Sequence, residues 1–158
     1  MSALRTPFYP ADAAFADRVR ASFARQKAMA HLGASLEEVE AGRCVVQLPH
    51  HDEVTQQHGY IHGGVVGAIA DSAAGYAAMT LTPADTSVLT VSYTLNLMAP
   101  AAGDHIEAHG EVVRAGRTLL VTRADVFAYN DGEATLCATL QQTIMALPDR
   151  PERQAQAR

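Results

Sequence analysis

The sequence predicts an α+β domain in which one long antiparallel β-sheet is wrapped around one central helix, with an N-terminal helix before the sheet. Two observations carry this prediction. Residues 65–79 are apolar or small on every side except for one charge, which is typical of a buried helix. After Pro83, four segments alternate between apolar and polar residues, as half-buried strands do.

The N-terminal region predicts a helix over about residues 11–30. Phe15, Val19 and Phe23 are spaced by four residues, so they share one face of a helix. Gly33 follows the last helical positions, where glycine commonly ends a helix. We therefore expect one continuous helix with a single apolar face.

Two short strands are expected next. Residues 36–48 have an extended pattern, and the pair Ala41–Gly42 interrupts it as a tight turn does. Residues 49–57 are polar and contain histidines, which predicts a loop between these strands and the central helix.

The central helix, residues 65–79, is rich in glycine and alanine, which allows a sheet to wrap closely around it. Gly67 and Gly75 lower its intrinsic helix propensity, so tertiary packing must stabilise it. Asp71 is its only charge, and no Lys or Arg lies within one turn. A buried carboxylate is costly unless it is paired or hydrogen-bonded. Asp71 is therefore either a satisfied structural group or a functional one.

The rest of the chain predicts four antiparallel strands, with hairpins joining most neighbours. In the first, the apolar odd-numbered residues from Leu89 to Leu97 are expected on one face, and the polar even-numbered residues, Thr90 among them, on the other. Asn130–Asp131–Gly132 is a strong hairpin signal. The expected strands are 87–97, 105–114, 118–129 and 134–147, with turns at 100–103, 115–116 and 130–132.

The composition restricts the class of protein. The formal net charge of −5 argues against nucleic-acid binding, which usually needs a basic face. No apolar run approaches the roughly 20 residues of a membrane-spanning helix, and the N-terminus lacks the apolar core of a signal sequence. Cys44 and Cys137 lie far apart in apolar surroundings, as reduced core thiols do. We expect one cytoplasmic domain over residues 1–158, with a core at about 36–147 and a loose polar tail over 148–158.

The segment His62–Gly63–Gly64 stands at the start of the central helix. Two glycines leave the first N–H groups unobstructed, and the helix dipole favours a negatively charged oxygen there. The alternative is that the glycines only permit close packing or a sharp turn. Gly63 and Asp71 are eight residues apart, which is about 12 Å along a helix. If both serve one reaction, Asp71 must come from another copy of the chain, in a dimer whose central helices are antiparallel.

Residues 56–64, QQHGYIHGG, followed by Asp71, resemble the signature of hot-dog-fold acyl-CoA thioesterases of the phenylacetic-acid-pathway type. The turn over 114–117, RAGR, also fits, and the resemblance covers about 36–147. It implies the hot-dog fold and hydrolysis of an aromatic or aliphatic acyl-CoA to a carboxylic acid and CoA. It also implies a homodimer with shared active sites, or a homotetramer.

The resemblance assigns roles to five residues. Asp71 is the general base or the nucleophile across the dimer interface, and the backbone N–H of Gly63 binds the thioester carbonyl. Gln56 occupies the position of the family's amide residue, for which Gln57 competes. Thr90 orients the attacking water, unless it faces solvent with the other polar residues of its strand.

Other residues have a functional and a structural interpretation. His62 shapes the oxyanion site or only orders the turn before the helix, and Gly64 offers a second N–H to the substrate. Arg114 and Arg117 bind the phosphates of CoA or are ordinary solvated charges of a turn. No cofactor is expected, because CoA is part of the substrate. No metal is expected, because the pair His58 and His62 lacks a carboxylate or Cys at ligand spacing.

Two other functions compete with hydrolysis. The first is an acyl-CoA sensor without catalysis, although a DNA-binding regulator would add a helix-turn-helix. The second is a hydratase or dehydratase on the same fold, although such enzymes place a His and a carboxylate at other spacings. A turnover assay separates hydrolysis from the sensor function.

Overall fold

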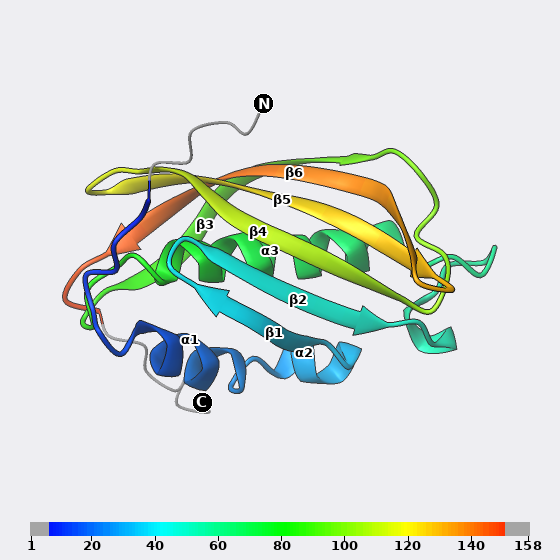
Figure 1. Ribbon diagram of the computed structural model, residues 1–158, viewed down its shortest axis with the longest axis horizontal. Helices are drawn as coiled ribbons and strands as arrows, with labels where there is room; N and C mark the ends of the chain where they lie inside the picture. Colours follow the sequence, from blue (N-terminus) through cyan, green and yellow to red (C-terminus); the bar gives the residue numbers. More distant parts are fainter. Residues whose placement is uncertain (1–6, 151–158) are drawn as a thin grey trace.

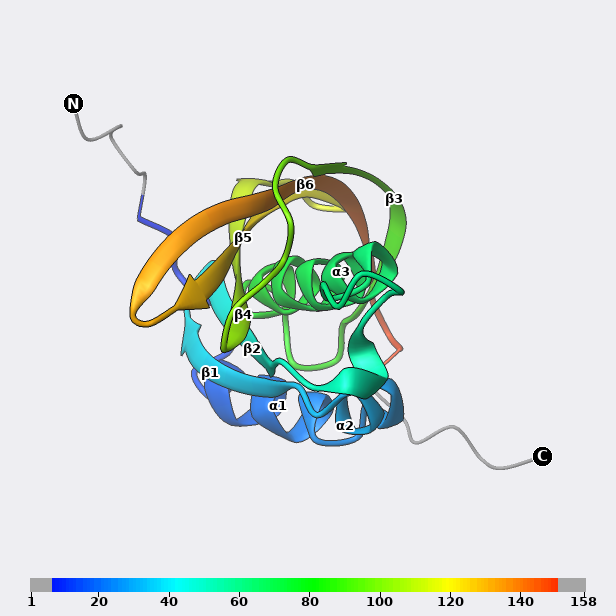
Figure 2. The same ribbon diagram turned by 90° about the vertical axis from the view of Figure 1, so that its right-hand side faces the viewer.

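A computed structural model describes residues 7–150 and contains one six-stranded antiparallel sheet wrapped around one long helix, α3 (Figures 1 and 2). The predicted fold class is confirmed. In chain order the elements are α1 (Phe15–Phe23), α2 (Lys27–Leu32), β1 (Ser35–Glu40), β2 (Arg43–Pro49), a 3-10 helix (Asp52–Val54), α3 (Gly63–Met79), β3 (Ser87–Leu97), β4 (His105–Ala115), β5 (Leu119–Asn130) and β6 (Glu133–Leu147).

The N-terminal region forms two helices, so the prediction of one continuous helix is wrong. The last turn of α1 tightens, with the N–H of Gln26 donating to the carbonyl of Phe23 (2.9 Å), and Gln26 then takes an extended conformation before α2. The physical reason is burial. Met29 lies six residues after Phe23, about 240° around a continuous helix from the apolar face. The break allows Phe23 and Met29 both to be buried. Gly33 ends α2 in the left-handed conformation, as expected.

The order of strands in the sheet is β1-β2-β4-β5-β6-β3. Tight hairpins join β1 to β2, β4 to β5 and β5 to β6. The predicted hairpin turn at 130–132 is confirmed, since Asp131 and Gly132 both have positive φ angles of 50° and 83°. The expected turn at 100–103 belongs instead to a crossing connection, because β3 pairs with β6 while β4 pairs with β2. The two edges of the sheet are therefore β1 and β3.

The prediction that the side chains of β3 alternate regularly between two faces is wrong, because the strand contains a β-bulge. Thr90 pairs with Ile144 and Ser92 with Thr143, so Val91 is an extra residue in the ladder. The bulge reverses the alternation: Thr90 before it and Leu95 after it both face α3. The apolar residues from Leu89 to Leu97 therefore do not share one face.

The sheet approaches α3 closely on one side and leaves it partly open on another. A Cβ added at Gly110 of β4 would collide with the backbone of Ala73, so only glycine permits this contact. From residue 66 to the end of α3 every residue is buried except Ala68, Asp71 and Gly75. These three lie on one line along the helix. We call Ala68, Asp71 and Gly75 the open strip of α3; the expectation that the helix is buried all round is wrong along this strip.

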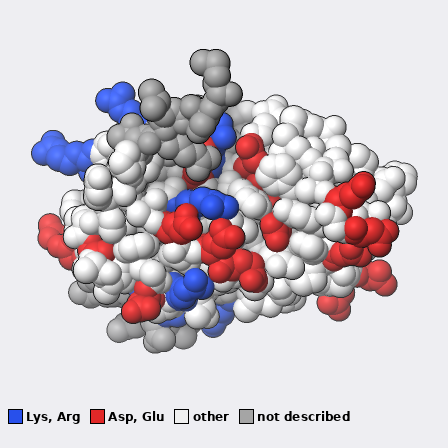
Figure 3. All heavy atoms as spheres, viewed as in Figure 1, with Lys and Arg blue, Asp and Glu red and all other residues white. Residues whose placement is uncertain are grey.

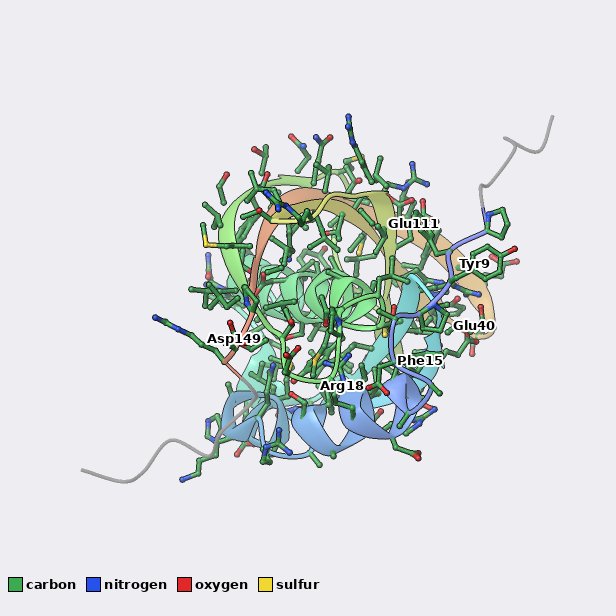
Figure 4. All side chains as sticks on the ribbon, turned by 90° about the vertical axis from the view of Figure 1, so that its left-hand side faces the viewer. Tyr9, Phe15, Arg18, Glu40, Glu111 and Asp149 are labelled. Carbon is green, nitrogen blue, oxygen red and sulfur yellow. The ribbon has the colours of Figure 1, made fainter. Side chains whose placement is uncertain are left out.

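Helices α1 and α2 lie along β1 and the lower side of α3 (Figure 2). Arg18 of α1 reaches the C-terminal end of α3, where its guanidinium donates to the carbonyls of Met79 (3.0 Å) and Thr82 (2.7 Å) (Figure 4). Asp12 pairs with the same guanidinium at 3.0 Å. The N-terminal helices are thereby fixed to the central helix.

Both cysteines are buried and free, as predicted. Burial raises the pKa of the Cys44 thiol to about 12, so the thiolate is disfavoured. No helix among residues 7–150 is long and apolar enough to cross a membrane. On the face seen in Figure 3, acidic and basic side chains are interspersed across the middle of the sheet. Most of the expected loose tail, residues 151–158, lies outside the described part of the chain.

Candidate active site

Asp71 lies on the open strip of α3 and has a specific partner on the neighbouring strand. The hydroxyl of Thr90 donates to Asp71 Oδ1 at 2.7 Å. The bulge at Val91 makes this bond possible, because it places Thr90 on the face of β3 that meets α3. The polar face of β3 expected from simple alternation would have pointed Thr90 away from Asp71.

Gln142 of β6 is a third member of this cluster and was not predicted. Its Nε2 donates to Thr90 Oγ1 (3.3 Å) and to the backbone carbonyl of Asp71 (3.4 Å). Its side chain is 2% exposed, and its Oε1 has no hydrogen-bond partner in the described structure. The sequence does carry a signal: Gln142 interrupts the row of inward apolar residues between Leu140 and Ile144. A buried side-chain amide in such a row is expected to hydrogen-bond to another polar group.

At the N-terminus of α3, some backbone N–H groups are hydrogen-bonded within the protein and one is not. His62 caps the helix, with its Nδ1 accepting from the N–H of Gly64 at 2.9 Å. The carbonyl of His62 accepts from Val65 and Val66. Within residues 7–150, the N–H of Gly63 has no protein acceptor. Of the two predicted donors, Gly63 is therefore free and Gly64 is used by the cap.

The loop before α3 is held by its own hydrogen bonds. The N–H of Gln56 donates to the carbonyl of Tyr60 (2.8 Å), and the N–H of Gly59 donates to the carbonyl of Gln56 (2.9 Å). The side-chain oxygen of Gln56 accepts from the N–H of His58. Gln56 lines the same cavity as Gly63, whereas Gln57 is exposed and does not. Gln56 is therefore the amide residue that lies beside the free donor.

Gly63 and Asp71 line two different cavities of one chain. The first, of about 330 Å³, includes Gly63, Gln56 and Tyr60. The second, of about 240 Å³, includes Asp71 and Thr90. Because both residues belong to the single helix α3, about 12 Å of helix separates them. One chain does not bring the free donor and the carboxylate together.

Arg114 and Arg117 are exposed at the β4–β5 hairpin and line neither of these cavities. His58, the other half of the histidine pair considered as a metal site, is also exposed. No group of three potential metal ligands gathers among the described residues.

Comparison with known proteins agrees with this architecture. Residues 58–135 match the family model of the thioesterase superfamily. The crystal structure of a thioesterase family protein from Silicibacter pomeroyi superposes with a TM-score of 0.83 at 44% identity, covering 85% of this chain and 98% of that one. A candidate esterase of Saccharolobus solfataricus is 33% identical over 95 residues, which is 60% of this chain and 66% of that protein. A 1,4-dihydroxy-2-naphthoyl-CoA hydrolase of Listeria monocytogenes is 29% identical over 67% of this chain and 85% of its own length. The chain belongs to the thioesterase superfamily, as a hot-dog-fold enzyme that hydrolyses thioesters.

Proposed function

We propose that the protein hydrolyses acyl-CoA thioesters to a carboxylic acid and free CoA, with Asp71 as general base or nucleophile and the N–H of Gly63 as oxyanion donor. The observation that carries this proposal is the hydrogen bond from Thr90 to Asp71 on the open strip of α3. A relative named as a CoA-thioester hydrolase supports CoA as the thiol. The likeness of residues 56–71 to the phenylacetic-acid-pathway type supports the same class.

The chemistry follows from these groups. The thioester oxygen accepts from Gly63 at the positive end of the helix dipole, which stabilises the oxyanion by several kcal/mol. Asp71 takes a proton from water as the water oxygen bonds to the carbonyl carbon. The tetrahedral intermediate then collapses and the C–S bond breaks. The CoA thiolate receives the proton that Asp71 took from water, which restores the carboxylate. If Asp71 attacks directly, its carboxylate oxygen bonds to the carbonyl carbon, the C–S bond breaks and CoA leaves as the thiolate. Water then hydrolyses the mixed anhydride to the carboxylic acid and restores the Asp71 carboxylate.

Two chains share each site in this proposal, because α3 separates Gly63 from Asp71. Gly63 of one protomer works with the partner's Asp71, and the symmetric contact makes a second site. Antiparallel packing of two α3 helices along their open strips brings these groups together. The small Ala68 and Gly75 on each side of Asp71 permit close approach of the two helices.

The edge strand β3 supports the same homodimer. It is eleven residues long, and no strand within residues 7–150 pairs with its outer edge. Long unprotected edges with exposed apolar side chains pair with other chains. Pairing of β3 with its copy would extend the sheet and place the two α3 helices side by side. The exposed apolar residues on or next to β3 are Leu89, Val91, Tyr93, Leu97 and Met98, each at least half exposed. Two such dimers would form the homotetramer.

The remaining predicted residues take supporting roles. Gln56 contacts the substrate beside Gly63, and Arg114 and Arg117 meet the phosphates of CoA at the exposed hairpin. His62 holds the first turn of α3 through its cap. The reaction uses no metal and no cofactor, since Asp71 activates the nucleophile. The two reduced thiols favour a cytoplasmic enzyme.

A panel of aryl, short-chain and long-chain acyl-CoA substrates tests the activity, with release of the CoA thiol as the readout. We expect release above background from at least one class. No release from any of them would reject the proposal, and binding without turnover would identify an acyl-CoA sensor.

Mixing two inactive variants tests the shared site. Asp71→Asn removes the base, and Gly63→Pro removes the donor. Proline suits the first position of a helix, and His62 before it is already extended (ψ 135°), as proline requires. A re-formed heterodimer keeps one intact site of two, so statistical mixing returns about a quarter of the wild-type activity. No recovery, with heterodimers demonstrated by mass spectrometry, would exclude sharing.

A further inference from the structure

The cavity beside Asp71 extends toward the N-terminal helices. Asp71 and Thr90 line one end, Gln26 and Tyr76 line the other, and Val88 and Ile144 form apolar walls between them. Tyr76 lies five residues after Asp71 on α3, about 7.5 Å farther along the helix. The cavity thus connects the proposed catalytic carboxylate with Gln26, which lies between the two N-terminal helices.

We propose that this cavity binds the acyl group, and that Gln26 recognises a hydroxyl or similar hydrogen-bonding group at the end of the acyl group remote from the thioester. The proposal rests on the proposed function, because it takes Asp71 as the group that meets the thioester carbonyl.

The polar end of the cavity is held rigidly. The Tyr76 hydroxyl lies 3.0 Å from Gln26 Nε2 and 3.1 Å from Ser22 Oγ, and Tyr76 and Ser22 are both buried. Phe23 packs edge-on against the Tyr76 ring, with the centroids 5.6 Å apart. An amide group has two donor hydrogens and two acceptor lone pairs, so the bond to Tyr76 leaves most of them for a ligand. Among described residues, Gln26 Oε1 has no protein partner.

The size of the cavity limits the acyl group. Its volume is about 240 Å³, and an apolar cavity of about 150 Å³ is known to bind benzene. One aromatic ring with a short linker therefore fits, whereas a long chain does not. Gly75 contributes no side chain to the wall, which keeps the path open.

The acyl group fits here better than CoA does. Tyr76, with the buried Ser22 hydrogen-bonded behind it, forms the wall of the cavity on the side of the N-terminal helices. The carboxylate of Asp71 at the entrance also repels phosphates. The cavity beside Gly63 is bordered by the exposed Tyr60 and Met98 and contains no carboxylate of the described residues, so it suits the CoA arm better.

The break between the two N-terminal helices, which burial of Phe23 and Met29 requires, also positions Gln26 at the cavity. Gln26 is the extended residue between α1 and α2, and the break directs its side chain to Tyr76. The N-terminal helices then contribute to specificity as well as to packing.

A matched pair of substrates tests the proposal: 3-phenylpropanoyl-CoA and 3-(4-hydroxyphenyl)propanoyl-CoA. One hydrogen bond of about 1.4 kcal/mol corresponds to tenfold, so the wild type should show a kcat/KM about tenfold higher for the hydroxylated substrate. Gln26→Met keeps side-chain length but removes the amide, and should bring the ratio to about one. Lys27→Met, at the exposed neighbouring position, is the matched control and should keep the wild-type ratio.

The same pair separates failure of the pocket from failure of the proposed function. Binding of both CoA thioesters to Asp71→Asn, measured by calorimetry, gives the ratio of Kd values without turnover. A ratio near one in the wild type, or a ratio unchanged by Gln26→Met, would overturn the acyl-pocket assignment. Absence of hydrolysis with an intact binding ratio would overturn only the proposed activity. Dodecanoyl-CoA should be a poor substrate; efficient turnover would contradict the size limit.

Discussion

The two ends of α3 differ in whether their backbone polar groups have hydrogen-bond partners within the protein. At the C-terminal end, the hydroxyls of Thr80 and Thr82 donate to the carbonyls of Ala77 and Met79 (2.6 and 2.9 Å). The Arg18 guanidinium donates to the same Met79 carbonyl and to that of Thr82. At the N-terminal end, His62 takes one N–H and the N–H of Gly63 has no acceptor in the described structure. The polar groups at one end are satisfied by the protein itself, and at the other end one backbone donor has no acceptor within residues 7–150.

Both ends follow the same electrostatics. A cation suits the C-terminus of a helix and an anion its N-terminus. At the C-terminus the cation is Arg18, which is part of the fold. At the N-terminus, no anionic group of the described residues contacts Gly63, which fits the proposal that a substrate brings its own developing negative charge. The difference separates stabilisation from function along one helix, and four variants test that separation.

The largest effect is expected at Asp71, between the two ends. In Asp71→Asn the amide oxygen still accepts from Thr90, so the fold should survive. Turnover should fall by about 10²–10⁴-fold, the usual contribution of a general base. Thiol release and thermal unfolding measure the two properties separately. A variant that retains most of its activity would show that the carboxylate is structural.

Arg18→Met should lower the free energy of unfolding by about 2–3 kcal/mol, because charged hydrogen bonds to buried carbonyls are lost and Asp12 is left without its partner. Urea denaturation measures this loss. The kcat of the folded protein should be unchanged. Arg20→Met is the control, since Arg20 makes one long bond (3.3 Å) at the surface and should lose little. Lost activity at unchanged stability would contradict the structural role of the C-terminal end.

Gln142→Leu should lower kcat about tenfold, because Thr90 loses a hydrogen bond of about 1–1.5 kcal/mol that holds its hydroxyl toward Asp71. Stability should be equal or higher, since the variant removes the unpartnered Oε1. Thr122→Val is the matched control: Thr122 is the cross-strand neighbour of Gln142, and its buried hydroxyl has no partner. An equal loss of activity in both variants would show that packing, not orientation of Thr90, is responsible.

The smallest effect is expected for His62→Ala, which removes the cap of α3 and should cost about 1 kcal/mol of stability. His62→Asn retains a capping oxygen and should recover most of it. Thermal unfolding of the two variants measures the difference. A loss as large as that of Arg18→Met would mean that the N-terminal end stabilises the fold as strongly as the C-terminal end.

The sequence by itself determined the elements, apart from the division of the N-terminal helix into α1 and α2, and much of the candidate site. The alternation in most of β4 and β5, the turn at Asn130–Asp131–Gly132 and the small apolar segment of α3 are local patterns, and local patterns suffice for elements and hairpins. The motif before α3 also placed Gly63 and Asp71 on one helix, and helix geometry alone set their separation.

Only the tertiary structure decided which side chains meet. The bulge at Val91 depends on the pairing of β3 with β6, some fifty residues away in sequence, and without it Thr90 points away from Asp71. Gln142 joins the cluster for the same reason. The break at Gln26 arises because Phe23 and Met29 must both be buried against elements that follow them in the chain. Register and burial are set by contacts between distant segments, and a one-residue shift moves a side chain to the opposite face.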